Sequence, residues 1–409
     1  MEGRSLYTIL SDYTKPQLED LRDLLGEPGL RNRSKAGLVE ELYGYLRGEP
    51  RRWLSRLTER DLRQLRELVH AGPDKVKIQA LSSYPTLLEA AGLVSTDDSE
   101  ENTHKVWIGP ELYDIVRKDV DEVLHAGEQS GRFELERMGI GYLNLCGVVP
   151  VDRLLTVVAD CYCQKYRRAN RNKVIKDIFN SPWYKLYHCI DENGEYLASP
   201  CLNAPEELFP IRNAMGAHHY AEDFTADRLY ESGCGAPYFS VGMKTPQGLR
   251  LEAMYRRVGY TGFDLTLALH DTWVESQYTS QPNEELFGPL MDSPLASQLD
   301  RESWMSCVQI VADYANSVPK WFLCGKTAAE EGKGLVDIGP EENAETPSNS
   351  QEYPNMWTMP EPTISEGYAS EMFYEDYPLG FAIPHVAPDD PCPCGSGLRY
   401  CRCHGRYLS

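Results

Sequence analysis

Four residues near the end of the printed sequence combine the side-chain types that most often bind zinc. Cys392 and Cys394 form a Cys-x-Cys pair, and Cys403 and His404 follow after eight intervening residues. Three thiolates and one imidazole so close together match a tetrahedral site in which protein atoms fill every position. We therefore predict that these four residues bind one structural zinc ion, and that the ion has no open position for a catalytic water.

The residues between the two ligand pairs suit the same site. Gly395 and Gly397 allow the backbone to turn with positive φ, which brings N–H donors close to the thiolate sulfurs. Three thiolates and a neutral imidazole leave the zinc site with one negative charge. Arg399 and Arg402 lie close enough in sequence to balance that charge.

The segment from Asp390 to Gly405 resembles the SEC-C motif, a zinc knuckle found at the C-terminus of the preprotein translocase motor SecA and at the ends of many otherwise unrelated bacterial proteins. This sequence has Leu398 where the family usually has Lys, and Cys401 where the family usually has a basic or polar residue. We interpret Cys401 as a free thiol. In SecA the knuckle recognises the chaperone SecB and the ribosome, so the resemblance implies docking of a protein partner. The alternative is a zinc knuckle with a purely structural role that binds no partner.

The N-terminal stretch from Thr14 to Arg47 has apolar residues at helical spacing and predicts two short helices, the second capped by Ser34. It resembles the helix-loop-helix modules of the SAP and Rho-N families. That resemblance implies contacts with nucleic acid through the loop and the start of the second helix. The implied contacts are Arg31, Arg33 and Lys35. The alternative is a solvated basic turn on a packing module.

A second unit is predicted to begin near residue 132, with helical runs over 132–145, 151–163 and 168–179. Strand-like segments follow at Tyr184–Ile190 and Glu195–Ala198, joined by a turn at Asn193-Gly194. Helices followed by a two-stranded ribbon predict a winged-helix-like domain. Its third helix would carry the basic residues Lys165, Arg167, Arg168, Arg171, Lys173 and Lys176. Such a helix can bind phosphates, and the alternative is a solvated helix face.

The common catalytic signatures are absent from the sequence, including the phosphate-binding loop, the nucleophile elbow and the His-Glu-x-x-His zinc motif. We therefore predict no nucleotide cofactor and no catalytic residue. His218-His219 with Glu222 and Asp223 is more simply interpreted as a surface group. A hydrolase or nuclease with an unrecognised site within 200–325 remains a second alternative.

Composition and charge bound the remaining possibilities. The net charge of −21 is uneven, because residues 325–390 hold fourteen Asp or Glu against two Lys. The stretch after Gly332 is rich in Glu, Pro, Ser and Gly, and predicts a flexible linker. The twelve cysteines form no even disulfide framework, and no apolar run is long enough to span a membrane. We expect a cytoplasmic bacterial protein with reduced cysteines.

Together these observations predict a mainly α-helical protein with small β-ribbons, an α+β fold built from several domains. The sequence favours a non-catalytic interaction or regulatory protein that binds partners through its zinc knuckle. The first alternative is a DNA- or RNA-associated regulator. The predicted divisions are a helical module at 1–50, a helical region with winged-helix-like features at 51–130, an α-rich body at 131–332, an acidic linker at 333–388 and the knuckle at 389–409.

Overall fold

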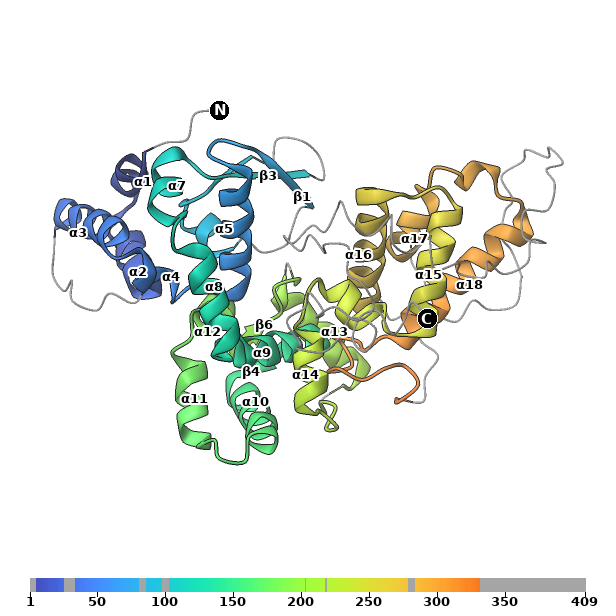
Figure 1. Cartoon of the computed structure of the whole chain (residues 1–409). Helices are drawn as coiled ribbons and strands as arrows, with labels where there is room; N and C mark the ends of the chain where they lie inside the picture. The colour runs from blue at the N-terminus through green and yellow to red at the C-terminus, as the bar shows by residue number, and fades with distance from the viewer. Residues whose placement is uncertain are drawn as a thin grey trace.

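The computed structural model describes residues 5–25, 34–80, 86–97, 103–202, 204–217, 219–278 and 284–331. Within these ranges the protein is mostly helical with two small antiparallel sheets, which confirms the predicted fold class (Figure 1). No helix in this part of the chain has both the length and the apolar character needed to cross a membrane. The predicted linker and knuckle, together with Arg31 and Arg33, lie outside the described residues.

The N-terminal lobe, on the left of Figure 1, contains eight helices of the described chain and one three-stranded sheet in the order β1-β3-β2. The predicted cap at Ser34 is confirmed, and α5 has a cap as well. Ser34 accepts a hydrogen bond from the Gly37 amide at 3.2 Å, and Thr58 forms a reciprocal capping box with Asp61. The elements are α1 (Leu6–Asp12), α2 (Lys15–Leu25), α3 (Lys35–Gly48), α4 (Pro50–Leu54), α5 (Glu59–Ala71), β1 (Lys77–Ala80), α6 (Leu87–Ala90), β2 (Ser95–Asp97), β3 (Thr103–Trp107), α7 (Pro110–Val116) and α8 (Val120–Gln129).

The middle of the chain forms a second unit whose three-stranded sheet has the order β4-β6-β5. The three predicted helical runs are confirmed, but the predicted strand at Tyr184–Ile190 is wrong in its first half. Pro182 begins a short helix that continues to Tyr187, because the fixed φ of proline suits the first turn of a helix. The elements are α9 (Arg132–Cys146), β4 (Val148–Pro150), α10 (Val151–Lys165), α11 (Arg171–Phe179), α12 (Pro182–Tyr187), β5 (His188–Asp191) and β6 (Gly194–Ala198).

The remaining described chain is helical and packs on this second unit. Trp273 and Trp321 are fully buried and meet edge to face, with ring centroids 5.4 Å apart. The indole of Trp321 donates a hydrogen bond to the Asn144 carbonyl at 2.9 Å, which connects the end of the described chain to α9. The elements are α13 (Leu208–Met215), α14 (Ala226–Ser232), a π-helical turn (Tyr238–Gly242), α15 (Pro246–Arg257), α16 (Gly262–Tyr278), α17 (Glu284–Met291) and α18 (Arg301–Ser317).

Two apolar cores underlie this arrangement, and they meet along α9. The first core runs from Leu6 to Phe133 and therefore joins residues from both of the predicted N-terminal divisions. The second core runs from Met138 to Ala328. Phe133 and Met138 lie one and a half turns apart on α9, so this one helix contributes to both cores. The predicted domain boundaries themselves remain predictions.

Candidate functional site

A cluster of charged side chains connects α5 of the first core to α9 of the second. The Glu59 carboxylate accepts a hydrogen bond from Arg137 Nε at 2.6 Å and one from Arg63 Nε at 2.7 Å. Arg63 also pairs with Glu128 at 2.8 Å. Glu59, Arg63 and Arg137 are buried, and a buried carboxylate is tolerated only when it is paired in this way. The three side chains therefore fix the position of α5 in the first core relative to α9 in the second.

Glu136 lies next to this cluster and is in a different ionisation state. Its Oε1 accepts a hydrogen bond from the Glu59 amide at 2.8 Å. Burial raises the pKa of Glu136 to about 8, and the nearby Glu59 carboxylate adds to the shift. Burial also acts on Glu59, but Arg137 and Arg63 outweigh it and lower the pKa of that carboxyl. At neutral pH Glu59 is thus ionised, while Glu136 is mostly protonated.

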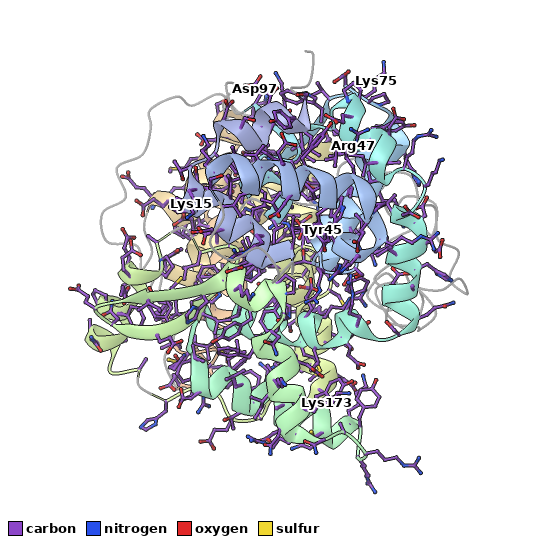
Figure 2. The ribbon with its side chains drawn as sticks, turned by 90° about the vertical axis from the view of Figure 1, so that its left-hand side faces the viewer. Lys15, Tyr45, Arg47, Lys75, Asp97 and Lys173 are labelled. Atoms are coloured by element: carbon purple, nitrogen blue, oxygen red, sulfur yellow. The ribbon has the colours of Figure 1, made fainter. Side chains whose placement is uncertain are left out.

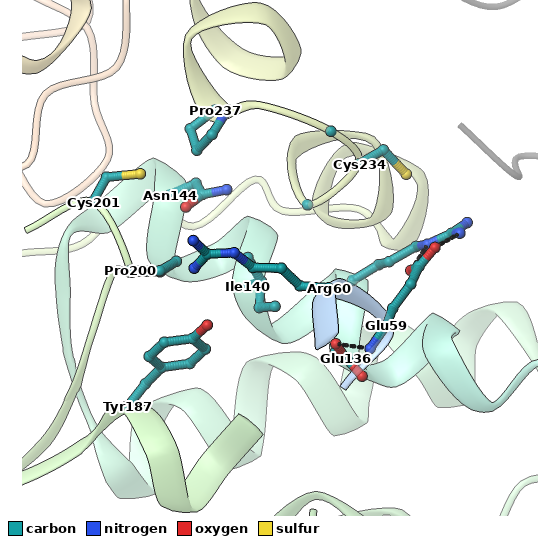
Figure 3. Close-up of a pocket in the computed structure, with 13 residues that line it drawn as sticks. Glu59, Arg60, Glu136, Ile140, Asn144, Tyr187, Pro200, Cys201, Cys234 and Pro237 are labelled. Atoms are coloured by element: carbon teal, nitrogen blue, oxygen red, sulfur yellow. Dashed lines mark hydrogen bonds and ion pairs between the residues drawn. The ribbon is translucent and has the colours of Figure 1, made fainter. Parts of the chain in front are cut away.

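A pocket that is partly open to solvent lies beside this cluster (Figure 3). The guanidinium of Arg60 reaches into it, beside Asn144 and Pro200 and above the ring of Tyr187. Arg60 also hydrogen-bonds the Tyr187 hydroxyl. The rest of the lining is mostly apolar or backbone, and comprises Ile140, Cys201, Gly233, Cys234, Gly235 and Pro237 together with Glu59, Glu136 and Arg137.

The pocket also contains one member of a cysteine, histidine and aspartate group. Cys201 lies at the pocket wall, and His270 of α16 lies near its thiol. His270 Nδ1 lies 3.3 Å from Asp271 Oδ1. Burial lowers the pKa of His270, but the hydrogen bonds and charges of Asp271 and Cys201 outweigh it and raise that pKa to about 9. At neutral pH His270 is therefore protonated.

The basic residues predicted to bind nucleic acid are not all in one helix. The predicted third helix is shorter than expected, because α10 continues through Lys165 and α11 begins only at Arg171. Arg168 therefore lies in the turn between the two helices, and Lys165 is paired with Glu134 at 2.9 Å. Asn170 caps α11 by accepting a hydrogen bond from the Lys173 amide, which fixes where this helix starts.

Fewer basic side chains on this unit are free of ion pairs, and so able to contact phosphates, than the sequence suggested. Arg171 pairs with Asp160, which neutralises it. Lys173, Lys176 and Arg168 are exposed, and among the described residues none of the three has an ion-pair partner. Lys173 lies near the opposite end of the molecule from Lys75 (Figure 2). Lys35 is exposed at the start of α3, in the N-terminal lobe.

The predicted metal ligands cannot be compared with the structure, since Cys392, Cys394, Cys403 and His404 lie outside the described residues. Within the described ranges, no group of three or more His, Cys, Asp or Glu side chains could hold a metal ion. The histidine pair that we interpreted as a surface group is described only at His219, which is exposed. Its neighbours Glu222 and Asp223 are exposed as well.

Sequence reasoning missed the pocket and the cysteine, histidine and aspartate group. Arg60 and Cys201 come from different cores, and His270 comes from a helix whose topology the sequence did not indicate. One local signal was present, because the Thr58–Asp61 capping box fixes the start of α5 and so the position of Glu59 and Arg60. The partners that these two residues meet could not be read from the sequence.

Comparison with known proteins gives one short similarity. A stretch of 27 residues is 63% identical to the protein translocase subunit SecA of Polaromonas sp. (strain JS666 / ATCC BAA-500). It covers 7% of this chain and 3% of that protein. No protein-family model matches the chain, and no solved structure matches it.

Proposed function

We propose that this chain is a docking protein that binds a protein partner through a C-terminal zinc knuckle. Cys392, Cys394, Cys403 and His404 would hold one zinc ion and so fix the short knuckle in a binding-competent shape. The observation that carries the proposal is the 27-residue similarity to a SecA subunit, which is compatible with a SEC-C knuckle. Four protein ligands around the zinc make its role structural and non-catalytic.

The described part of the chain supports the proposal that the knuckle is a unit separate from the two cores. Its two apolar cores are built from residues between Leu6 and Ala328, and no metal cluster occurs among these described residues. The eight cysteines in this part are all free thiols, which agrees with a reducing compartment such as the cytoplasm. Thiolate ligands for zinc are also stable there.

Purified SecB and ribosomes are suitable probes, because the SEC-C knuckle of SecA recognises both. We expect at least one of them to bind the full-length chain in a pull-down, and the Cys392→Ser variant, which lacks a zinc ligand, to lose that binding. Cys401→Ser is the matched control, since it removes a neighbouring thiol that we do not assign to zinc. Equal binding by wild type and Cys392→Ser, or no binding of either probe, would refute SecA-like docking.

The second candidate function is nucleic-acid binding by the middle unit. A helix, a strand, further helices and a hairpin follow one another from α9 to β6, and the sheet order is β4-β6-β5. We infer from this order a winged-helix-like unit, in which α11 would be the recognition helix and the β5–β6 hairpin the wing. Lys173 and Lys176 lie on the exposed face of α11, opposite the buried Val174 and Ile178.

Charge reversal tests this second function. We expect Lys173→Glu combined with Lys176→Glu to weaken binding of a 20-base-pair DNA duplex. The slope of log affinity against log salt concentration should also become shallower, by the amount that the loss of about two phosphate contacts causes. Fluorescence anisotropy between 50 and 300 mM NaCl measures both quantities. Lys75→Glu combined with Lys118→Glu makes the same charge change on exposed residues of the N-terminal lobe. If both double variants weaken binding equally, α11 has no specific role.

A further inference from the structure

The outer face of α11 carries positive charge that the zinc-knuckle function does not use, and the acidic stretch before the knuckle carries negative charge. We propose that residues 366–377 of this same chain bind along α11 through Lys173, Lys176 and Phe179. This proposal commits the surface to one occupant, and it depends on neither of the functions proposed above. It assigns an intramolecular role to part of the acidic stretch.

The first argument is a row of exposed side chains on α11. Lys173, Lys176 and Phe179 are all exposed, and residues three positions apart in a helix are neighbours on one face. Val174 and Ile178 are buried in the second core, on the other side of the helix. Phe179 is 52% exposed, which is unusual for so large an apolar side chain. The row therefore presents two ammonium groups followed by an aromatic ring.

The second argument is the charge of this surface. Among the described residues neither lysine of the row has an ion-pair partner. Arg167 and Arg168, in the turn before α11, are also exposed and have no such partner in the described part of the chain. Asp177 is the only acid of α11, so the surface keeps a net positive charge. An acidic ligand is the one that complements it.

The third argument comes from the aromatic end of the row. The ring of Tyr184 lies 5.0 Å from the ring of Phe179, measured between centroids. The hydroxyl of Tyr184 is buried and has no hydrogen-bond partner among the described residues. Buried hydroxyls without a partner are rare in native proteins, and a carboxylate that approaches from the side of Phe179 could accept this hydrogen bond. This end of the row therefore suits a ligand with both aromatic and acidic groups.

Residues 366–377 have the composition that complements the row. They lie outside the described residues, and their sequence contains four acids, four aromatic residues and no Lys or Arg. The acids can pair with the two lysines, while an aromatic ring can pack on Phe179. The acids are Glu366, Glu371, Glu375 and Asp376, and the aromatic residues are Tyr368, Phe373, Tyr374 and Tyr377.

The length of chain before this segment is sufficient to reach α11. The described chain ends at Glu331, and Ala328 belongs to the same core as Val174 and Ile178 of α11. The 34 residues at 332–365 can span up to about 110 Å when extended, whereas a unit of the size of the second core is about 40 Å across. A tether of this length also holds the segment near the surface at about millimolar effective concentration, so weak contacts suffice.

The β5–β6 hairpin favours a short segment over a nucleic acid as the occupant. The hairpin adjoins the aromatic end of the row, because Tyr184 also stacks on His188 of β5 with centroids 5.4 Å apart. It exposes the carboxylates of Asp191, Glu192 and Glu195. A nucleic acid that continued from α11 to the hairpin would meet these negative charges, whereas a segment of twelve residues can bind the row alone.

Carbodiimide cross-linking of the full-length protein tests whether the contact exists, because the reagent joins an amine to a carboxylate only when the two touch. We expect mass spectrometry of the monomer band to show Lys173 and Lys176 linked to carboxylates of residues 366–377. Lys75 and Lys118 are the matched controls, as exposed lysines of the N-terminal lobe that should not form these links. The proposal is overturned if the α11 links are absent, if the control lysines form them equally, or if they occur only in cross-linked dimers.

Charge reversal and its rescue test the same contact by proteolysis. Chymotrypsin can cleave after Tyr374, and cleavage after Trp357 of the same chain provides an internal reference. We expect Lys173→Glu combined with Lys176→Glu to increase cleavage at Tyr374 relative to Trp357 by about fivefold, because two ion pairs are lost. Adding Glu371→Lys and Glu375→Lys to that variant should restore the wild-type ratio. Lys75→Glu combined with Lys118→Glu should leave the ratio unchanged.

The outcomes of the proteolysis separate this proposal from the other functions. Circular dichroism verifies that each variant is folded. The proposal is overturned if the α11 variant cleaves like wild type, or if the reversed charges on the segment do not restore the ratio. Loss of DNA binding by the α11 variant without a change at Tyr374 would assign the surface to nucleic acid instead. None of these results affects the zinc-knuckle function, which is tested by Cys392→Ser.

Discussion

At the scale of single residues, two buried ionisable groups make opposite contributions to stability. Glu136 has its pKa raised to about 8, so the folded state holds a proton that the unfolded chain loses near 4.5. Lys320 is fully buried, donates a hydrogen bond to the Ser276 carbonyl at 2.6 Å, and has its pKa lowered by burial to about 7. The folded state therefore releases a proton that the unfolded chain still holds.

The sign of each effect gives a testable pH dependence. Because the pKa of Glu136 is raised in the folded protein, its favourable contribution is complete below pH 4.5 and is lost as pH rises to about 8. Among its charged neighbours, Glu59 and Asp61 raise the pKa of Glu136 and Arg132 lowers it, and the value of about 8 includes these effects. In the wild-type protein this loss lowers the free energy of unfolding by at most about 1.4 kcal/mol per pH unit in this window. We expect the Glu136→Gln variant to lack that decline. Urea unfolding at pH 5, 6, 7 and 8 measures it.

Lys320→Met provides the contrast for this experiment. The lowered pKa of Lys320 means that its contribution grows as pH rises from about 7 toward 10.5, the reverse of Glu136. The methionine variant should therefore change the pH dependence above pH 7 and leave the interval from 5 to 6.5 as in wild type. An unchanged profile for Glu136→Gln between pH 5 and 8 would show that this carboxyl is ionised in the folded protein.

At the scale of elements, the contact between α9 and α14 fixes the geometry of the pocket. A side chain at Gly141 would place its Cβ 1.9 Å from the Leu229 carbonyl oxygen, and one at Gly233 would lie 1.8 Å from the Arg137 carbonyl oxygen. The two backbones approach this closely because neither position has a side chain. The approach brings Gly233 and Cys234 to the pocket wall opposite α5.

Two glycine substitutions test this helix contact. We expect Gly141→Ala to destabilise the protein by about 3 kcal/mol or more, because backbone atoms cannot move aside as a flexible side chain can. Gly44→Ala is the matched control in the exposed interior of α3, where no atom lies within 4 Å of the added Cβ. That change should be stabilising by about 0.5–1 kcal/mol. Similar effects of both substitutions in urea unfolding would contradict the close approach.

At the scale of the whole molecule, the two cores form one body through α9, while the predicted zinc knuckle follows an acidic stretch of the sequence. Burial of many large side chains in the cores, including Trp53, Trp183, Trp273 and Trp321, provides the apolar area that stabilises the body. A metal is not required for that packing. The body and the zinc site should therefore respond independently to mutation.

Zinc content and thermal unfolding test this independence together. We expect one zinc ion per wild-type chain by elemental analysis and none in Cys392→Ser, because three ligands bind zinc far more weakly than four. The main thermal transition should stay within about 2 °C, since no contact of the cores is changed. Cys401→Ser should retain the metal. Loss of the main transition in Cys392→Ser would show that the knuckle belongs to the core.

The sequence by itself determined the features that depend on near neighbours. Helical periodicity predicted the three helices of the middle unit, and the cap at Ser34 was predicted because a cap involves residues only three positions apart. The zinc ligand set is also local, and it remains a prediction. The break between α10 and α11 was predicted, but α11 begins three residues later than expected because Asn170 caps it.

Only the tertiary structure decided which distant residues meet. The pairing of Glu59 with Arg137 depends on the crossing of α5 and α9, and the contact of Trp273 with Trp321 depends on how α16 packs against the end of the described chain. Such contacts follow from the burial of two whole cores, so no spacing in the sequence indicates them. The raised pKa of Glu136 has the same origin, because its main cause is burial and the fold decides which carboxyls are buried.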